Sequence, residues 1–502
     1  MKDPGLASVA RQKLSTRHFA LGALAFFSCA SAASEANLTL DPAVRHQTIE
    51  GFGTCLISWV PRMAEYYQQE SFQKFYLEEL GASVLRIDLW NGSAPIEKEN
   101  WADISFRDFD LSQTDGRGGV FVDNAARLHE RSGGKLKIIA SVWSPPKWMK
   151  VNRAIGNGST TRQNRGLDFR DPRKLGLWSA PLPDDADGSE FSMIGMNKLR
   201  HDRYLHFAKL LVEWTRFFHE KGITLHGLSP QNEPRFSQWY ESCVYTPAEY
   251  AELLRVIDWM FRHENVEKPR IFGPEHMTHA AEDNRKYLDA IFSQPEGEQL
   301  IDALASHGYV DGVRMDSRPE SPAAFAQFSE KYQKPVWMTE GGTGSHEWPA
   351  ALNQIGVMMM TSLTTGNASL IAPWQIAEDE PSTHALSTTE GPTKKSYLAM
   401  QYFRFIRPGM VRVELKGATK DVLAAGFLEP VSKQVVLVVL NRAAVATDLR
   451  VSFAGSESYR IDQLYVTDAS RDCAEVSAAA GSALTLSAPP ESLLTLRLRP
   501  AN

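Results

Sequence analysis

The sequence is poor in cysteine, which removes several ways of stabilising and equipping a protein. Only four of its 502 residues are cysteine, Cys29, Cys55, Cys243 and Cys473, and none forms the C-x-x-C or Cys/His spacing of a zinc site. A disulfide-stapled fold is therefore excluded, and stability must come from a large core. Cys55 and Cys243 could meet at one rim as a disulfide, but two buried free thiols are the favoured interpretation.

The motifs of three other enzyme classes are also missing. Four histidines precede a glutamate, yet none begins an H-E-x-x-H, and no G-x-S-x-G occurs. The turn Gly51-Phe52-Gly53 lacks the third glycine of a dinucleotide-binding fingerprint. A zinc hydrolase, a serine hydrolase and a Rossmann-type oxidoreductase are set aside, and the sequence implies no cofactor and no metal.

Charge and hydropathy give no sign of a nucleic-acid or membrane partner. Lys and Arg number 54 against 60 Asp and Glu, without a basic cluster. The apolar run Phe19 to Phe27 is shorter than the roughly 20 residues that span a bilayer. Basic residues at 11, 13 and 17 precede it and Ala30-Ser31-Ala32 follows it, as in a secretory signal peptide. We expect residues 1–32 to be cleaved from a secreted or periplasmic protein.

Short apolar runs alternate with longer amphipathic stretches through much of the chain, which is typical of repeated βα units and a parallel sheet. The eight runs are Ile49 to Cys55, Val84 to Trp90, Leu136 to Trp143, Leu225 to Pro230, Arg270 to Glu275, Leu304 to Tyr309, Val336 to Glu340 and Leu370 to Ile376. Among the helices between them, Pro247 to His263 has Thr246 placed to cap it. The pattern predicts an α/β fold, a (β/α)8 TIM barrel over residues 46–407.

Two segments depart from this pattern. Residues 152–199 are rich in Gly, Asp, Asn and Arg with little periodicity, which indicates an insertion after the third strand. After Arg407-Pro408-Gly409 the sequence alternates as strands do, for example over Val435 to Leu440. Residues 408–502 are therefore predicted to form an antiparallel β-sandwich.

Glutamates follow the fourth and seventh runs, in Gln231-Asn232-Glu233-Pro234 and in Thr339-Glu340-Gly341. Barrel active sites lie at the carboxyl ends of the strands, and strands 4 and 7 face each other across the mouth. Hydrolysis of glycosides with retention needs two carboxyl groups about 5 to 5.5 Å apart. One such glutamate could be merely solvated or cap a helix, but the pair favours catalysis by Glu233 and Glu340.

Several motifs resemble glycoside hydrolase family 30, a family of retaining barrel glycosidases. They are Gly51-Phe52-Gly53, Leu85-Arg86-Ile87, Trp143-Ser144-Pro145-Pro146-Lys147-Trp148-Met149, Gln231-Asn232-Glu233-Pro234, His307-Gly308-Tyr309, Trp337-Met338-Thr339-Glu340 and Arg407-Pro408-Gly409. The resemblance implies a β-sandwich fused to the barrel, joined by a strand at 37–45. It also implies that Glu233 is the acid/base, that Glu340 is the nucleophile, and that Asn232 holds the sugar 2-hydroxyl.

The chemistry of the two glutamates predicts their surroundings. A nucleophile must stay ionised while the acid stays protonated, so Glu340 needs a cation or donor and Glu233 a less polar setting. Arg86 and Tyr309 are the candidates for Glu340's neighbours. A surface ion pair for Arg86 and a core position for Tyr309 are the alternatives. His307 either binds substrate or fixes its neighbours.

Aromatic residues are the expected platforms for a sugar, because sugars stack their apolar faces on rings. Trp143 and Trp374 sit at strand ends and are the first candidates. Trp148 and the pair Trp239-Tyr240 are further ones. A core position is the alternative for each.

The substrate is inferred from the family branches. The segments Lys334 to Glu340 and Phe405 to Arg412 look closest to the xylan-degrading branch, which favours an endo-β-1,4-xylanase acting as a monomer. The loop after strand 8, Ala377 to Ser396, contains no arginine that could bind glucuronate. Gly51 to Leu56 is similar to β-1,6-galactanases, so a β-1,6-galactanase or β-1,6-glucanase is the alternative. A non-catalytic carbohydrate-binding protein would be an alternative of another class, but the presence of both glutamates argues against it.

Overall fold

The computed structural model describes residues 34–56, 61–89, 97–109, 117–156, 197–238, 240–279, 281–309, 320–456, 458–477 and 484–501. The predicted signal peptide at 1–32, most of the predicted insertion at 152–199, and Trp239 lie outside the described residues.

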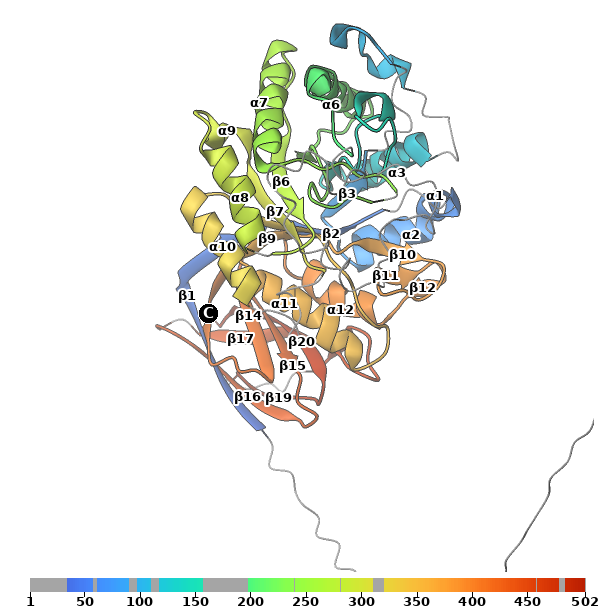
Figure 1. Ribbon diagram of the computed structural model, residues 1–502. Helices are drawn as coiled ribbons and strands as arrows, with labels where there is room; N and C mark the ends of the chain where they lie inside the picture. Colours follow the sequence, from blue (N-terminus) through green and yellow to red (C-terminus); the bar gives the residue numbers. More distant parts are fainter. Residues whose placement is uncertain are drawn as a thin grey trace, which may run out of the picture.

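Eight parallel strands form a closed barrel in the upper part of Figure 1, and the pairing of its first strand with its last closes the ring. The barrel strands are β2 (Gly51–Cys55), β3 (Val84–Asp88), β4 (Lys137–Ser141), β5 (Gly227–Ser229), β6 (Arg270–His276), β7 (Ala303–His307), β8 (Val336–Glu340) and β9 (Ala368–Ile371). Each predicted run overlaps one of these strands, so the predicted (β/α)8 barrel is confirmed. Three short strands extend the sheet beside β2, namely β10 (Gln375–Glu378), β11 (Ala385–Thr388) and β12 (Gly391–Pro392).

Helices cover the outside of the barrel (Figure 1). The α-helices are α1 (Pro61–Gln68), α2 (Glu70–Lys74), α3 (Arg117–Arg131), α6 (Tyr204–Glu220), α7 (Pro247–His263), α8 (Ala281–Phe292), α9 (Gly297–Leu300), α10 (Glu320–Tyr332), α11 (Val357–Thr364) and α12 (Lys394–Phe403). Short π-helices at Phe75–Glu79 and Leu352–Gly356 continue α2 and precede α11. Thr246 begins α7 with a capping box, in which its side chain and that of Glu249 bond to each other's backbone N–H groups.

The interior of the barrel is packed with side chains from most of the barrel strands. This inner cluster comprises Val84, Ile139, Phe272, Ala303, Ala305, Trp337, Leu370 and Ala372. A side chain at Gly227 would lie only 3.0 Å from the rings of both Phe272 and Trp337, so a glycine there makes room for them. The barrel is therefore a solid scaffold, and its two ends differ in what they expose.

A second sheet of nine strands curls below the barrel (Figure 1). Its strands are β1 (Ser34–Thr48), β13 (Val411–Lys416), β14 (Val422–Leu428), β15 (Val435–Asn441), β16 (Thr447–Phe453), β17 (Tyr459–Thr467), β18 (Ala474–Val476), β19 (Leu484–Ala488) and β20 (Ser492–Pro500). They pair antiparallel except β1 with β16, and their inward residues form a core separate from that of the barrel. This is the predicted β-sandwich region, fused to the barrel.

The first described strand, β1, is an interior strand of that sheet. β1 pairs antiparallel with β13 and parallel with β16, and it covers 34–48, where the resemblance implied 37–45. Its ladder with β13 is interrupted between Asp41 and Arg45 and again between Arg45 and Thr48. β1 thus belongs to the second sheet along its length and delivers the chain to the barrel at Gly51.

Helix α12 joins the barrel to the second sheet. Gln401 donates to the hydroxyl of Thr467 (2.6 Å) and to the carbonyl of Leu493 (3.0 Å), and it accepts from Thr495 (2.8 Å). Tyr402, on the same buried helix, donates to the carbonyl of Gly356 (3.0 Å). A buried amide with all these partners ties the two parts into one body.

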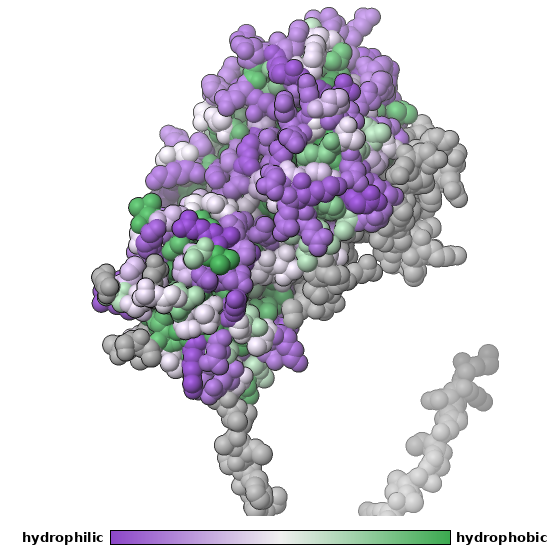
Figure 2. All heavy atoms as spheres, turned by 90° about the vertical axis from the view of Figure 1, so that its left-hand side faces the viewer, coloured by the Kyte–Doolittle hydropathy of each residue, from purple (hydrophilic) through white to green (hydrophobic). Residues whose placement is uncertain are grey.

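Figure 2 shows one face that is largely hydrophilic, with hydrophobic residues scattered in small patches. None of the described helices has both the length and the apolar character needed to cross a bilayer.

Candidate active site

Glu233 and Glu340 meet at the carboxyl ends of the barrel strands. Glu233 follows β5, while Glu340 is the last residue of β8. Both are nearly buried, with 7% and 5% of their surface exposed. A carboxylate oxygen of each, together with a ring nitrogen of His307, lies within 4.8 Å of the others. The two glutamates, 107 positions apart in the sequence, therefore face each other across a short gap.

Both oxygens of Glu340 accept hydrogen bonds from strong donors. Arg86 Nη1 lies 2.7 Å from Oε2, and the Tyr309 hydroxyl lies 2.6 Å from Oε1. Arg86 is completely buried on β3. Burial and the charge of Glu340 raise the pKa of Tyr309 far above its usual value, so this hydroxyl remains a donor. The two residues expected beside Glu340 thus both donate hydrogen bonds to it.

Glu233 lies in a different environment. Burial raises the pKa of Glu233, and the adjacent His307, whose Nδ1 is 2.9 Å from Oε1, opposes the rise. The backbone of Glu233 has the left-handed φ of 48° and donates its N–H to the carbonyl of Glu275 (3.2 Å). The carboxyl group is therefore held in place, and its raised pKa favours the protonated form.

His307 lies among three carboxyl groups. Besides Glu233 beside Nδ1, its Nε2 lies 3.6 Å from Glu275 and 3.7 Å from Glu340. Burial alone would lower the pKa of His307, but Glu340, Glu233 and Glu275 outweigh it and raise the pKa to about 9. His307 is completely buried. Of its two possible roles, the geometry supports the fixing of neighbouring side chains.

Glu275 is a member of this cluster that the sequence reasoning did not single out. It lies on β6, is completely buried, and accepts from Arg86 Nη2 (3.1 Å) and from the Thr339 hydroxyl (2.6 Å). The fifth predicted run ends at this glutamate, which is the same signal that identified Glu340. A third inward carboxylate could therefore have been suspected from its place at a strand end.

Asn232 is oriented by the same arginine. Arg86 Nη2 donates to Asn232 Oδ1 (2.8 Å), and the backbone N–H of Asn232 donates to the carbonyl of Val142 (2.7 Å). Arg86 therefore links Asn232, Glu275 and Glu340 through one guanidinium group. The amide of Asn232 is fixed beside Glu233, which is where its implied role with a sugar hydroxyl would place it.

Trp143 and Trp374 lie over Arg86. The guanidinium carbon of Arg86 is 4.7 Å from the Trp143 ring and 6.0 Å from the Trp374 ring, and the two rings are 5.8 Å apart. Trp148 instead packs edge-on against His206, at 5.8 Å. The first pair thus lies at the site, whereas Trp148 belongs to the packing around α6.

The loop after the eighth barrel strand borders the same mouth. The exposed His384 lies edge-on to the ring of Tyr309, with 6.3 Å between the ring centres. Asp379 of this loop forms an ion pair with Arg62 of α1. The loop between β10 and β11 thus brings acidic groups and a histidine toward the site.

Glu233, His307 and Glu340 have ligand atoms close enough to coordinate a metal ion, but their partners do not suit one. Arg86 already brings a positive charge to 2.7 Å from Glu340. His307, with a raised pKa, presents N–H groups rather than the neutral nitrogen that metals bind. We assign no metal to this cluster.

The three described cysteines form no disulfide. Cys55, Cys243 and Cys473 are buried free thiols.

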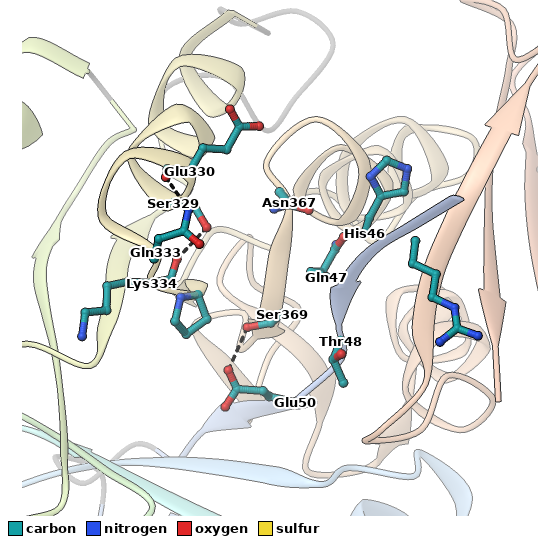
Figure 3. A pocket seen from close by; sticks show the side chains of 12 residues that line it. His46, Gln47, Thr48, Glu50, Ser329, Glu330, Gln333, Lys334, Asn367 and Ser369 are labelled. Atoms are coloured by element: carbon teal, nitrogen blue, oxygen red, sulfur yellow. Dashed lines mark hydrogen bonds between the residues drawn. The ribbon is translucent and has the colours of Figure 1, made fainter. Parts of the chain in front are cut away.

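A cleft of about 640 Å³ opens at the opposite end of the barrel (Figure 3). It is lined by β1, the end of α10 and residues that precede β8 and β9. Glu50 at its floor accepts from Ser369 (3.0 Å) and Trp337 (2.9 Å) and pairs with Arg270. Burial would raise the pKa of Glu50, but His226, Arg270 and Trp337 outweigh it and hold the pKa low. This satisfied polar group fits a structural role, because catalytic groups of such barrels lie at the other end.

Comparison with known proteins gives sequence and structural relatives. No family model matches the sequence. The glucuronoxylanase XynC of Bacillus subtilis is 22% identical over 422 residues, which cover 82% of this chain and 79% of that protein. The endo-1,6-beta-D-glucanase of Neurospora crassa is 24% identical over 292 residues, 55% of this chain and 51% of that protein. The crystal structure of Xyn30A, a glycoside hydrolase family 30 subfamily 8 xylanase from Clostridium acetobutylicum, matches with a TM-score of 0.68 at 19% identity and covers 92% of this chain and 99% of that one.

The fold, the two facing glutamates and the relatives agree. The solved structure shares both the barrel and the fused sheet, and the similarity to the glucuronoxylanase extends over most of both proteins. The chain thus has the fold of the glycoside hydrolase family 30 xylanases and is similar in sequence to curated glycanases.

Proposed function

We propose that this protein is a secreted, retaining endo-β-glycanase whose substrate is a plant polysaccharide, with β-1,4-xylan as the first candidate. The observation that carries the proposal is the Glu233–Glu340 pair. Its oxygens lie within 4.8 Å, which fits the short separation of retaining enzymes rather than the roughly 6.5–9.5 Å of inverting ones. The pattern of residues 11–32 supports export.

The two environments suit a double displacement. Glu340 attacks the anomeric carbon while Glu233 gives its proton to the departing glycosidic oxygen, which forms a glycosyl ester on Glu340. Glu233, now ionised, takes a proton from water as the water attacks the same carbon and releases Glu340. Two inversions retain the β configuration. An α-anomer as the first product in early proton NMR spectra would contradict this mechanism.

A β-1,6-glucanase or β-1,6-galactanase is the second candidate. The loop that follows the eighth strand offers Glu378 and Glu380, and its Asp379 is paired with Arg62, so it is poorly suited to bind the carboxylate of glucuronic acid. One relative is an endo-1,6-beta-D-glucanase, which supports a β-1,6 linkage as the alternative to xylan.

Reducing-sugar release separates these candidates. The protein would be assayed on glucuronoxylan, arabinoxylan, β-1,6-galactan and β-1,6-glucan, with Glu340→Gln as the blank. Release from both xylans supports the first candidate, and release from a β-1,6 polymer alone supports the second. No release from any of them would favour a non-catalytic carbohydrate-binding protein.

A further inference from the structure

Glu275 is built into the site although it cannot reach a substrate. The ladder of β6 with β7 pairs Pro274 with Ala305 and then His276 with Ser306, which leaves Glu275 as the extra residue of a bulge. Its φ is 54°, a left-handed value that is uncommon for a glutamate. Bulges redirect side chains next to active sites. This bulge turns a completely buried carboxylate toward the catalytic cluster.

Three contacts of Glu275 lead to the proposed catalytic glutamates, two through their partners and one directly. Its Oε1 is 3.1 Å from Arg86 Nη2, the arginine that binds Glu340. The same oxygen is 3.6 Å from Nε2 of His307, whose other nitrogen contacts Glu233. Its backbone carbonyl accepts the N–H of Glu233. Glu275 therefore contacts the residues that position both the proposed nucleophile and the proposed acid/base.

The charges of the cluster explain why a third carboxylate is useful. Burial would raise the pKa of Glu275, but Arg86 and His307 outweigh it and hold the pKa at about 2, so this group is ionised at neutral pH. With Arg86 and His307 positive, Glu340 ionised and Glu233 protonated, the cluster is neutral. After Glu340 is esterified and Glu233 has lost its proton, the cluster is neutral again. Without Glu275 both states would hold an excess positive charge away from water, which is costly.

We propose that Glu275 is a positioning residue whose fixed negative charge holds Arg86 against Glu340 and keeps His307 protonated beside Glu233. Its chief effect falls on the second half-reaction, in which Glu233 must carry a negative charge and act as a base. The proposal rests on the roles given to Glu233 and Glu340 in the proposed function.

Other titratable groups around Glu275 and His307 do not supply this charge. Those that face the pair, besides the charged groups already named, are Tyr250, His276, His279 and Tyr309, while Cys55 faces Arg86. Burial raises the pKa values of the thiol and the phenols and lowers those of the two histidines, so all five stay neutral. The charge of the cluster is then carried by Arg86, His307, Glu275 and one of the two glutamates Glu233 and Glu340 at a time.

The first test measures the titration of His307 in the free protein, without substrate. Histidines labelled with ¹³C at Cε1 are followed by NMR against pH, and His307→Asn identifies the signal. We expect the transition near pH 9 in the wild type and about one pH unit or more lower in Glu275→Gln. Thr339→Val is the matched control, because it removes a donor to the same oxygen without changing the charge, and its titration should stay at the wild-type value.

Glu275→Asp is a second variant that tests the proposal even if Glu275→Gln does not fold. It keeps the charge on a shorter side chain, so the His307 transition should lie between those of the wild type and Glu275→Gln, with thermal melting as the check on folding. The proposal is overturned if Glu275→Gln folds and its His307 transition is not shifted. If Glu275→Gln does not fold, the proposal is overturned when Glu275→Asp shows no shift of the His307 transition.

The second test separates the two half-reactions. On a 2,4-dinitrophenyl β-glycoside of the released sugar, formation of the glycosyl enzyme needs no acid. Glu275→Gln should therefore show a burst of dinitrophenol followed by turnover slowed about tenfold or more. A shifted His307 titration with unchanged turnover would overturn the role in the second half-reaction. A shifted titration without hydrolysis of any glycan would refute the proposed function and leave the electrostatic role of Glu275 intact.

Discussion

The backbone N–H of Glu233 donates a hydrogen bond to the backbone carbonyl of Glu275, 3.2 Å away. Both residues have left-handed φ values, 48° and 54°; Glu233 follows β5, and Glu275 is the penultimate residue of the neighbouring strand β6. The ends of two adjacent strands are thereby fixed to each other at the residue that carries the proposed acid/base. The position of the proposed acid depends on main-chain geometry as well as on its side-chain partner His307.

Replacement of Glu340 by glutamine should abolish turnover while the protein stays folded. The amide keeps the shape and can still bind Tyr309, but it cannot form the glycosyl ester. Reducing-sugar release should fall to background, while far-UV circular dichroism and the melting temperature stay close to those of the wild type. Glu390→Gln, an exposed glutamate on the turn between β11 and β12, is the control and should retain full activity. Substantial activity in Glu340→Gln would remove the assigned nucleophile.

Glu233→Ala should lose activity on polysaccharide by about 10²- to 10⁴-fold, the usual contribution of a general acid/base. The loss should be smaller for release of dinitrophenol from an aryl β-glycoside, because that leaving group needs no proton. Sodium azide should accelerate the variant and yield a β-glycosyl azide, since the anion attacks the glycosyl enzyme without a base. An α-azide, or no effect of azide, would contradict the role of Glu233.

The stability of the protein should decline from near-neutral to alkaline pH. The pKa of His307 is about 9 in the folded state, above its ordinary value of 6.5. Its contribution to folding is therefore complete below pH 6.5 and is lost as the pH rises through 9, up to about 3 kcal/mol. Urea unfolding between pH 6 and 10 measures this slope. His307→Asn should be less stable than the wild type at pH 6, and its free energy of unfolding should fall less steeply as the pH rises. An equal slope in both proteins would refute the contribution of His307.

Trp374→Ala should weaken the handling of polysaccharide without disturbing the fold. A stacked aromatic platform contributes about 0.5–1.5 kcal/mol, so kcat/KM should fall roughly two- to twelvefold, mainly through KM. Trp374→Phe should recover part of the loss. Trp259→Ala, which removes a half-exposed tryptophan on α7, is the control. Equal effects of Trp259→Ala and Trp374→Ala would argue against a platform at Trp374.

Gly53→Ala should destabilise the barrel severely. A Cβ atom on Gly53 would lie 1.8 Å from the carbonyl oxygen of Val84, so β2 and β3 would have to separate. We expect a loss of about 3 kcal/mol or more, measured by urea unfolding. Gly133 has a left-handed φ, but a Cβ atom added there would have no other atom within 4 Å. Gly133→Ala should therefore cost only about 1–2 kcal/mol of backbone strain. Similar losses of unfolding free energy in the two variants would mean that the close approach of Val84 is not the reason why position 53 requires glycine.

The scaffold was predictable because its signals are local. The runs of apolar, β-branched residues mark the barrel strands, and Thr246 with Glu249 marks the start of α7. The strand ends then indicate which side chains point into the mouth, which is how Glu233 and Glu340 were selected. The interior position of β1 is different, because nothing in Ser34–Thr48 itself specifies two partner strands more than 350 residues away.

The surroundings of the catalytic pair were only partly predictable. Arg86 and Tyr309 follow from the chemical need for a cation and a donor beside an ionised nucleophile. Glu275 could not be assigned a role in the same way, because its contacts with Arg86 and His307 depend on a bulge and a left-handed backbone in β6. Alternation along a strand does not reveal where a bulge occurs.

The position of β1 between β13 and β16 affects how the molecule is assembled during synthesis. The strand made first must wait for strands that leave the ribosome last, so the sheet closes only when almost the whole chain is available. A translation product that stops before β13 would present both edges of β1 unpaired. A C-terminal fragment moved to another enzyme would lack β1, the strand that lies between β13 and β16. Transplanting this sheet as a module would therefore require both ends of the chain.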